Sequence, residues 1–337
     1  KPSATYPQQQ DSAANLISSL FLKPKERFWL EKLPDKTERK EHIFYLGCYA
    51  IMYPHLIATA INILQKMELD FETVGGTPTC CGHPFLRSGN LEAAETFDRK
   101  RSGIFESMGA KEVIQWDPSC TQFTTNFTNQ YLSTSFRYKS LEQFISENIG
   151  KITFKKTLKK TVAIHDHPPY VHSFTGLYDP RTYDYDSQRK VIGSIPGIDL
   201  VEMTHNMENA LACGYEALPY GGGNKIMAHE TNTKLLEEAV NSGADTLAVF
   251  WQACYHSLLP YENKYPIEIR HFIEILGDRM GIQLPKNKFK EYKLGGNIES
   301  VLENSRENLE ANGFEVEAVR DLVAKYMQIG SNSPLKF

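Results

Sequence analysis

The chain has 337 residues, of which 41% are hydrophobic and 23% are charged, and its formal net charge is -4. This length and apolar content suffice for a buried core in two domains rather than one. A weak net negative charge gives no broad cationic field, so neither nucleic acid nor an anionic membrane surface is an expected partner. The sequence has no apolar run near the roughly 20 residues of a membrane-spanning helix and no signal-peptide pattern, and we expect a cytoplasmic location.

Residues 1 to about 40 form a polar segment rich in Gln, Ser, Lys and Glu. Apolar patches interrupt it at residues 16–17, 20–22 and 28–30. Such patches predict a partly helical arm that packs on its own globule or on a partner subunit.

Strand and helix patterns alternate from His42 onward. Short apolar runs predict strands at residues 42–46, 69–74 and 112–116. Helical spacing of apolar residues predicts helices at 51–67, 92–108 and 141–149. This alternation is typical of an α/β domain with a mainly parallel sheet.

The C-terminal half repeats this plan. Residues 109–113 leading to Cys120 match residues 243–247 leading to Cys254 with identical spacing, and Cys81-Gly82 matches Cys213-Gly214. The predicted helix at 141–149 finds its counterpart at 269–280. We therefore expect two pseudo-symmetric Rossmann-like halves with mainly parallel sheets, an N-terminal arm and a C-terminal helical extension. The expected divisions are 1–40, 41–150, 160–284 and 285–337, with a lysine-rich linker at 151–160 and C-terminal helices at 298–312 and 316–327.

The six cysteines are too few for a disulfide scaffold and are unevenly placed: Cys48, Cys80, Cys81, Cys120, Cys213 and Cys254. The first four follow three predicted strands of one half, and the carboxyl ends of parallel strands meet at one edge of a sheet. Four thiolates are the usual complement of an iron–sulfur cluster. Zinc also takes four thiolates but usually from spaced pairs, so the adjacent Cys80 and Cys81 favour a cluster.

The order Cys48, Cys80-Cys81-Gly82 and then Asp117-Pro118-Ser119-Cys120 resembles the cysteine-rich CCG domain of heterodisulfide reductase B subunits and related complexes. The resemblance covers about residues 42–282. In that family five thiols hold a noncubane [4Fe-4S] cluster at which disulfides are split or formed. The resemblance implies that Cys48, Cys80, Cys81 and Cys120 ligate iron. Asp117 takes the fifth position, where it either ligates iron or caps the following helix, so the cluster is noncubane, an ordinary cubane or smaller.

The second copy of the motif is degenerate. The family's first cysteine would fall within residues 165–169, where no cysteine stands, and only Cys213 and Cys254 remain. Three interpretations stay open: a redox dithiol, a metal site completed by a histidine, and inert remnants. The candidate histidines are His165, His167 and His256. We rank the inert remnant first for metal binding, because a histidine near a cysteine is more often packed or capping than ligating.

The resemblance implies an oxidoreductase subunit that is active only within a heterodisulfide-reductase-like complex, beside ferredoxin-like and flavin subunits. Its substrate would be a thiol, a disulfide or another sulfur compound. One alternative is a non-catalytic subunit that relays electrons or serves assembly. Another is the iron–sulfur subunit of a lactate- or glycolate-oxidising complex, because such subunits carry similar modules.

Overall fold

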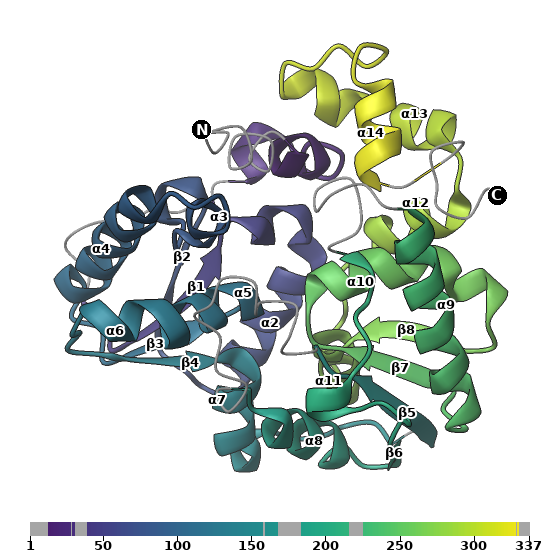
Figure 1. Ribbon diagram of the computed structural model, residues 1–337, viewed down its shortest axis with the longest axis horizontal. Helices are drawn as coiled ribbons and strands as arrows, with labels where there is room; N and C mark the ends of the chain where they lie inside the picture. Colours follow the sequence, from purple (N-terminus) through teal and green to yellow (C-terminus); the bar gives the residue numbers. More distant parts are fainter. Residues whose placement is uncertain are drawn as a thin grey trace.

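Two α/β halves lie side by side in the structure, which is a computed structural model. It describes residues 13–27, 29–30, 39–157, 159–167, 183–215, 225–327 and 329. Figure 1 shows the strands of the first half beside those of the second half, with the N-terminal segment and the C-terminal helices together at one end.

Each half is built on a four-stranded, fully parallel sheet. The strand orders, β2-β1-β3-β4 and β6-β5-β7-β8, are the same. The strands are β1 (His42–Gly47), β2 (Phe71–Gly75), β3 (Glu112–Gln115), β4 (Arg137–Ser140), β5 (Lys160–His165), β6 (Ile198–Val201), β7 (Thr246–Val249) and β8 (Glu268–His271). The predicted pair of Rossmann-like halves is therefore confirmed.

Both faces of the first sheet are buried at β1, which explains the continuous apolar run of that strand. Successive side chains of a strand point to opposite faces. Phe44 and Leu46 accordingly join the large core shared with the second half, whereas Ile43 and Tyr45 join a separate core of the first half. A parallel sheet covered on both sides needs such uninterrupted apolar runs.

The helices mostly follow the predicted periodicity. Those of the first half are α2 (Pro54–Lys66), α3 (His83–Arg87), α4 (Leu91–Ser107), α5 (Pro118–Phe123), α6 (Asn129–Tyr131) and α7 (Leu141–Glu147). Those that follow are α8 (Tyr185–Gly193), α9 (Lys225–Asn241), α10 (Gln252–Leu258), α11 (Phe272–Arg279), α12 (Lys288–Gly295), α13 (Ile298–Ala311) and α14 (Arg320–Met327).

The prediction of a helix from residue 269 was wrong at its start. Ile269 and His271 belong to β8 and pair with Leu247 and Val249 of β7, so the helix begins only at Phe272. A short strand that leads directly into a helix leaves one apolar run, in which the change of period is hard to see. The corresponding strand β4 of the first half was missed because its sequence, Arg-Tyr-Lys-Ser, has no apolar run.

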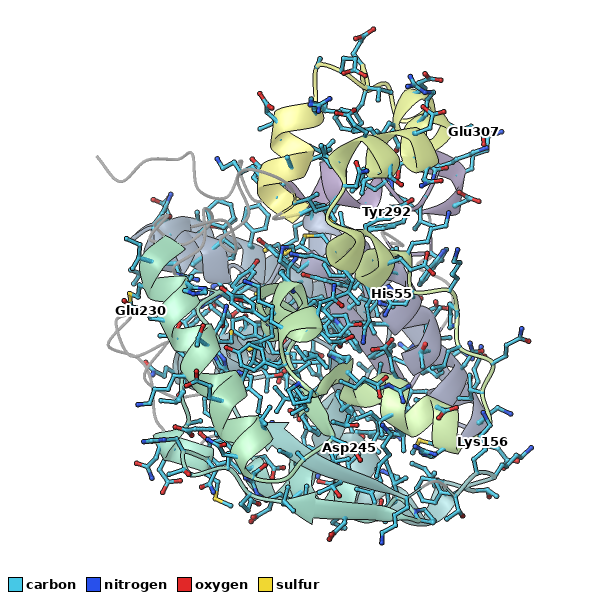
Figure 2. The ribbon with its side chains drawn as sticks, turned by 90° about the vertical axis from the view of Figure 1, so that its right-hand side faces the viewer. His55, Lys156, Glu230, Asp245, Tyr292 and Glu307 are labelled. Carbon is cyan, nitrogen blue, oxygen red and sulfur yellow. The ribbon has the colours of Figure 1, made fainter. Side chains whose placement is uncertain are left out.

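The N-terminal segment packs on the C-terminal helices. Ile17 and Leu20 are fully buried, and the ring of Phe21 stacks on Tyr292 at 5.8 Å. The Asn312 side chain on this extension donates to the Leu22 carbonyl at 2.9 Å. Figure 2 shows Tyr292 and Glu307 at one end of the molecule and Asp245 at the other. The N-terminal segment and the C-terminal helices thus pack against each other.

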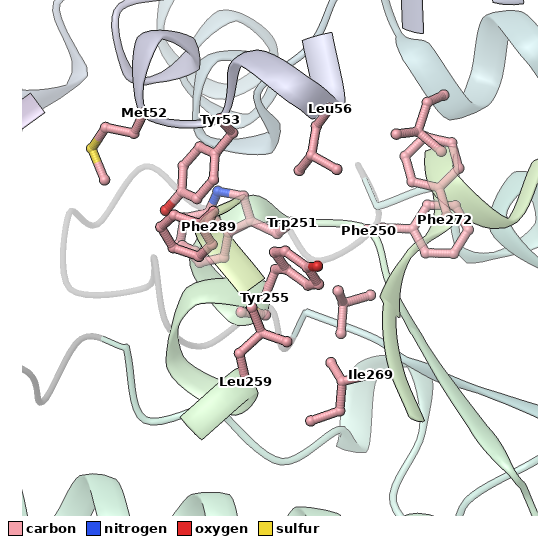
Figure 3. Close-up of a cluster of buried hydrophobic side chains, with 14 of the residues drawn as sticks. Met52, Tyr53, Leu56, Phe250, Trp251, Tyr255, Leu259, Ile269, Phe272 and Phe289 are labelled. Atoms are coloured by element: carbon pink, nitrogen blue, oxygen red, sulfur yellow. The ribbon is translucent and has the colours of Figure 1, made fainter. Parts of the chain in front are cut away.

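The halves meet through two pairs of helices. α2 of the first half packs on α11 of the second, and α7 of the first half packs on α8 of the second. Since α2 and α8 follow the first strand of their halves, and α7 and α11 the last, the two pairs are related by a pseudo-twofold axis. Figure 3 shows Tyr53 and Leu56 of the first half pointing toward Trp251 and Tyr255 of the second half, and the rings of Tyr53 and of Phe289 in α12 lie 5.0 Å apart.

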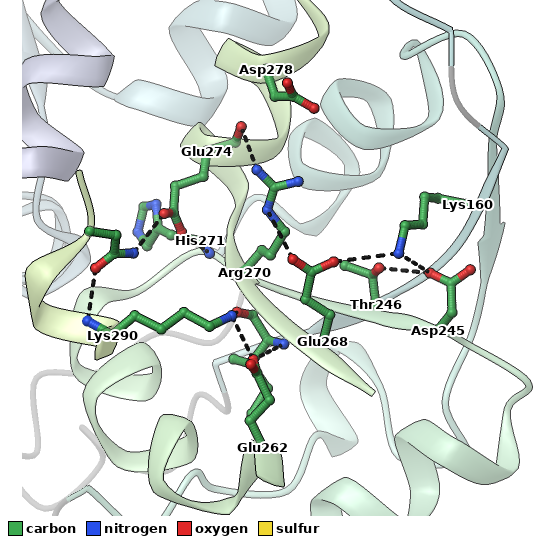
Figure 4. Close-up of polar contacts among 12 residues, drawn as sticks. Lys160, Asp245, Thr246, Glu262, Glu268, Arg270, His271, Glu274, Asp278 and Lys290 are labelled. Carbon is green, nitrogen blue, oxygen red and sulfur yellow. Dashed lines mark hydrogen bonds and ion pairs between the residues drawn. The ribbon is translucent and has the colours of Figure 1, made fainter. Parts of the chain in front are cut away.

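The edge strand β8 is covered rather than exposed. The Ile269 amide donates to Glu262 at 2.6 Å, and Lys290 of α12 donates to the Ile269 carbonyl at 3.0 Å (Figure 4). Lys290 also pairs with Glu262 at 2.7 Å. Side chains thereby satisfy the edge groups that an additional strand would otherwise pair with.

Within the described part of the chain, no helix combines the length and apolar character needed to cross a membrane.

We expect Gly277→Ala to destabilise the contact between the halves. A β-carbon at Gly277 of α11 would lie 2.8 Å from Thr59 Cγ2 of α2, and Thr59 is held by its own hydrogen bond to the His55 carbonyl. Overpacking of this kind costs about 1–3 kcal/mol. Gly103→Ala is the matched control, because it lies within α4 with no atom within 4 Å and should stabilise by about 0.5–1 kcal/mol. Denaturant unfolding of both variants measures the difference, and equal shifts would contradict the close helix contact.

Candidate functional site

The structure brings together the four N-terminal cysteines. Cys48 follows β1, the Cys80-Cys81 pair follows β2, and Cys120 lies on α5 just after β3. The Cys48 and Cys80 sulfurs are 3.9 Å apart, and those of Cys81 and Cys120 are 3.4 Å apart. Cys80, Cys81 and Cys120 are buried, and all four are free thiols. Three loops thus deliver four sulfurs to one edge of the first sheet.

Local backbone and side-chain contacts hold the loop of the adjacent cysteines. Gly82 has a φ of +99°, and a β-carbon there would lie 2.5 Å from the Ala94 carbonyl oxygen of α4. Only glycine allows both this conformation and this approach. The Tyr45 hydroxyl donates to the Thr79 carbonyl at 2.7 Å, which fixes the residue just before the adjacent cysteines.

Burial and neighbouring acidic groups make it costly to ionise these four thiols. Contact with Cys81, together with burial and repulsion from Cys81 and Asp117, raises the pKa of the Cys120 thiol well above its ordinary value. Arg101 opposes this effect with its positive charge. Arg101 is fully buried, pairs with Asp98, and lies over the Tyr45 ring at 5.4 Å. Among the described residues, its Nε and Nη1 have no hydrogen-bond acceptor.

Asp117 caps a helix and joins the two halves. Its carboxylate accepts from the Ser119 amide at 2.8 Å, at the N-terminus of α5. The same carboxylate accepts from the side-chain amide of Gln252 at the start of α10. Both residues are buried, and desolvation raises the pKa of Asp117. The structure therefore gives Asp117 a capping and bridging contact, whereas a ligand role stays a prediction.

A second group forms at the equivalent edge of the second sheet. His165 Nε2 lies 3.3 Å from the Cys254 sulfur, and the ligand atoms of His165, Cys213 and Cys254 all lie within 4.8 Å of one another. His167 Nδ1 is 3.9 Å from the Cys254 sulfur. Burial would raise the pKa of Cys213, but contacts with Cys254 and His165 outweigh it and lower that pKa to about 6.

His256 is not part of this second group. Its Nδ1 contacts the Tyr53 hydroxyl at 3.1 Å, and its Nε2 contacts the Tyr326 carbonyl at 2.9 Å. Both contacts point into the packing between α10 and its neighbours. Of the three histidines proposed from the sequence, the structure thus brings His165 and His167 to the thiols.

Two hollows of very different size adjoin the two groups. A cavity of about 60 Å³ borders Cys48, Cys81 and Cys120. A cleft of about 670 Å³ runs between the halves to His165, His167 and Cys254. Trp251 lines both hollows and packs edge-on against His167 at 4.2 Å between ring centres. The second group, which has fewer thiols than the first, therefore adjoins the larger hollow.

Comparison with known families bears directly on this geometry. The cysteine-rich CCG domain matches residues 42–123 and 174–259, together about half of the chain. The chain belongs to the cysteine-rich CCG-domain family. The first match contains all four N-terminal thiols, and the second contains Cys213 and Cys254. His165 and His167 lie outside both matched segments.

Individual relatives are oxidoreductase components and related proteins. The CCG chain is 24% identical over 279 residues to the D subunit of dihydromethanophenazine:CoB–CoM heterodisulfide reductase from Methanosarcina acetivorans, covering 78% of this chain and 65% of the relative. It thus spans less than two thirds of that relative. It is 22% identical to lactate utilization protein A 1 of Bacillus mycoides, covering 69% of this chain and 95% of the relative. A solved hypothetical protein from Helicobacter pylori shares the fold, with TM-score 0.52, 14% identity and coverage of 83% of this chain and 55% of that one.

Sequence reasoning missed three residues that shape the site. Arg101 lies in a helix among other charged residues, so its complete burial has no local signal. Gln252 and Trp251 occupy positions where the family motif would have cysteine or its spacer, and their contacts reach the other half. For these two residues, the only signal in the sequence was that Trp251 stands where the family motif has a cysteine.

We expect Asp117→Ala to lower stability through two lost contacts. Loss of the cap costs about 1 kcal/mol, and leaving the buried Gln252 amide without its partner costs about 1–3 kcal/mol more. Ser140→Ala is the matched control, because Ser140 caps α7 through the Gln143 amide, a contact within the first half. A denaturant double-mutant cycle with Gln252→Ala should show that the two losses are not additive. Simple additivity would contradict the bridge.

The pH dependence of stability should carry a contribution from Glu142, which lines the cleft. Desolvation raises its pKa from 4.5 to about 7, and the Asp184 charge adds to this. A raised folded-state pKa of an acid contributes stability at low pH that is lost as pH rises from about 4.5 to about 7. Glu142→Gln should therefore flatten this decline. Unfolding free energies measured across that window test this, and parallel pH profiles for both proteins would contradict it.

Proposed function

We propose that the chain is an iron–sulfur redox subunit that holds one [4Fe-4S] cluster through Cys48, Cys80, Cys81 and Cys120. It would serve a heterodisulfide-reductase-like complex that converts thiols, disulfides or other sulfur compounds. The observation that carries this proposal is the convergence of four free thiols from three loops at one sheet edge, in a chain of the CCG family. Relatives named as heterodisulfide reductase subunits and iron–sulfur proteins support it.

The residues present fit such a cofactor. Four soft thiolates are the preferred donors of iron–sulfur clusters. The four thiols are free, three of them are buried, and none forms a disulfide, so all four sulfurs are available as ligands. Arg101 supplies a buried positive charge that acts on Cys81 and Cys120, together with two N–H groups that lack acceptors among the described residues. That charge would offset part of the negative charge of the thiolates.

The protein's own residues would bind, orient and shield the cofactor. When bound, an iron–sulfur cluster supplies one-electron transfer and iron that can coordinate a sulfur ligand. Tyr45 and Gly82 fix the loop of the adjacent cysteines, so their sulfurs keep a defined separation. Asp117 already accepts from Ser119 and Gln252, and we propose that it orients α5 rather than ligating iron. Trp251 and Gln252 would exclude water from the second-half side.

Membership of a complex follows from the relatives, which are named as subunits. We propose ferredoxin-like and flavin-containing partners that supply or remove electrons. The chain spans less than two thirds of the heterodisulfide reductase subunits that it matches.

A second candidate is an iron–sulfur subunit of a lactate-oxidising complex. The observation that favours it is coverage: the match extends over 95% of a lactate utilization protein. Affinity purification of the full chain from its native cells would separate the two. Co-purification with a flavin hydroxy-acid oxidase would support the second candidate, and ferredoxin-like or sulfur-metabolising subunits would support the first.

Cys81→Ser should remove essentially all bound iron and acid-labile sulfide from protein prepared without oxygen. An alkoxide replaces a thiolate poorly as an iron ligand, and Cys81 contacts both Cys80 and Cys120. Cys213→Ser is the matched control, a buried cysteine of the second half, and should leave iron and sulfide unchanged. Asp117→Ala should also retain iron if Asp117 only orients α5. Colorimetric iron and sulfide assays measure all three.

Metal analysis of the wild-type protein decides against the proposal if it finds zinc without sulfide. Tetrahedral zinc with Zn–S bonds of about 2.3 Å has sulfur separations of about 3.8 Å. The observed separations of 3.9 and 3.4 Å are close to that value. A zinc ion lost in Cys81→Ser would therefore identify a structural zinc site at the first-half thiols.

A further inference from the structure

The second half contains a compact set of metal-binding atoms that the proposed cluster does not use. A ring nitrogen of His165 and the sulfurs of Cys213 and Cys254 lie within 4.8 Å of one another. All three side chains are at least 97% buried. They come from three separate elements: the end of β5, the loop before Gly214, and α10. Three potential metal ligands thus converge at one buried point, which is more than a single histidine next to a cysteine would provide.

The separations suit a single tetrahedral ion. With Zn–S bonds near 2.3 Å and Zn–N bonds near 2.0 Å, tetrahedral angles give nitrogen–sulfur separations of about 3.5 Å. His165 Nε2 and the Cys254 sulfur are 3.3 Å apart. One ion could therefore contact both atoms with little movement, and Cys213 is within reach of the same point.

Charge balance also points to a divalent cation. Two thiolates and a neutral imidazole around Zn²⁺ have no net charge, so burying the complex costs far less than burying unpaired ions. A mixture of two sulfurs and one nitrogen suits zinc, whereas calcium and magnesium require oxygen donors. An all-thiolate iron–sulfur cluster would lack two of its four ligands here.

The surroundings hold these donors in place. Ser257 of α10 donates to the Cys213 carbonyl at 2.6 Å, and Asn232 of α9 donates to the Ser257 hydroxyl at 3.0 Å. Next to His165, the fully buried Asp166 pairs with Arg189 at 2.8 Å and accepts from the Met207 amide at 2.7 Å. These contacts fix the segments that carry the donors, whereas the Nδ1 atom of His165 itself has no hydrogen-bond partner among the described residues.

Two residues of the set, His165 and Cys254, line the cleft, so a fourth position of a bound ion would be accessible from it. The cleft of about 670 Å³ is lined by His165, Cys254 and His167. His167 lies 3.9 Å from the Cys254 sulfur but does not belong to the set within 4.8 Å. A site with three protein ligands and one open position is the arrangement of catalytic rather than structural zinc.

We propose that His165, Cys213 and Cys254 bind one zinc ion whose fourth position opens to the cleft beside His167. This site is separate from the first-half thiols, and the proposal does not depend on what those thiols hold. It replaces the interpretation of Cys213 and Cys254 as inert remnants.

The test measures zinc, iron and sulfide in the same preparations of the full chain. The wild type should contain about one zinc per chain. Zinc should fall at least about tenfold in His165→Ala, Cys213→Ser and Cys254→Ser, while iron and sulfide stay unchanged. Cys81→Ser should show the reverse, with iron lost and zinc retained. His167→Ala is the matched control within the site, a buried histidine outside the ligand set, and should retain zinc.

Cobalt substitution gives a second measurement that does not rely on the variants folding. Wild-type protein whose zinc has been exchanged for Co²⁺ should show the visible bands of tetrahedral cobalt and thiolate-to-cobalt charge transfer. Adding imidazole should shift these bands, because the fourth position is open. Absence of both zinc and cobalt binding in folded wild type would overturn the proposal. So would a disulfide between Cys213 and Cys254, iron loss in Cys254→Ser, or zinc loss in His167→Ala. Absence of iron and sulfide from the wild type, with zinc still bound, would overturn only the proposed function.

Discussion

The packing of α2 on α11 and of α7 on α8 is the constraint on which both donor groups depend. It joins the halves about a pseudo-twofold axis and brings the carboxyl ends of β3 and β7 together. The Asp117–Gln252 hydrogen bond and the stacking of Trp116 on His271 at 5.1 Å cross this junction. Each donor group consequently has one wall supplied by its own sheet and another supplied by the opposite half. Neither group would be enclosed in an isolated half.

The same scaffold carries different chemistry at equivalent positions. Tyr45 pairs with Gln115 in the first sheet, and His165 pairs with Val249 in the second, so the two residues hold the same place in the two registers. Tyr45 donates a hydrogen bond to the Thr79 carbonyl in the cysteine loop, whereas His165 contacts the Cys254 sulfur directly. Gly82 and Gly214 are also equivalent, since each lies against the backbone of the following long helix, at Ala94 and Ala228 respectively. The two halves therefore have the same backbone arrangement at these positions but different side chains at the sites.

Much of the fold could be predicted from the sequence because its signals are local. Apolar runs and the repeated cysteine spacing were enough to predict two parallel α/β halves and the meeting of Cys48 with the three other thiols. The contacts that complete the sites are not local. Asp117 and Gln252 are 135 positions apart, and Cys254 meets a histidine 89 positions away. Local spacing could not choose His165 over His256, which is closer in sequence but packs against Tyr53. The prediction at residue 269 failed for a different reason, because a four-residue strand runs into a helix without a break.

The hollows beside the two donor groups differ in volume. A cavity of about 60 Å³ lies beside the first-half thiols. The cleft of about 670 Å³ falls within the range of small-molecule sites, which is about 300–1,000 Å³. The cleft therefore has the volume of a small-molecule site, whereas the cavity beside the first-half thiols does not. A small molecule that reached Cys254 would enter through the cleft. Trp251 lines both hollows, and it stands at the position equivalent to Asp117.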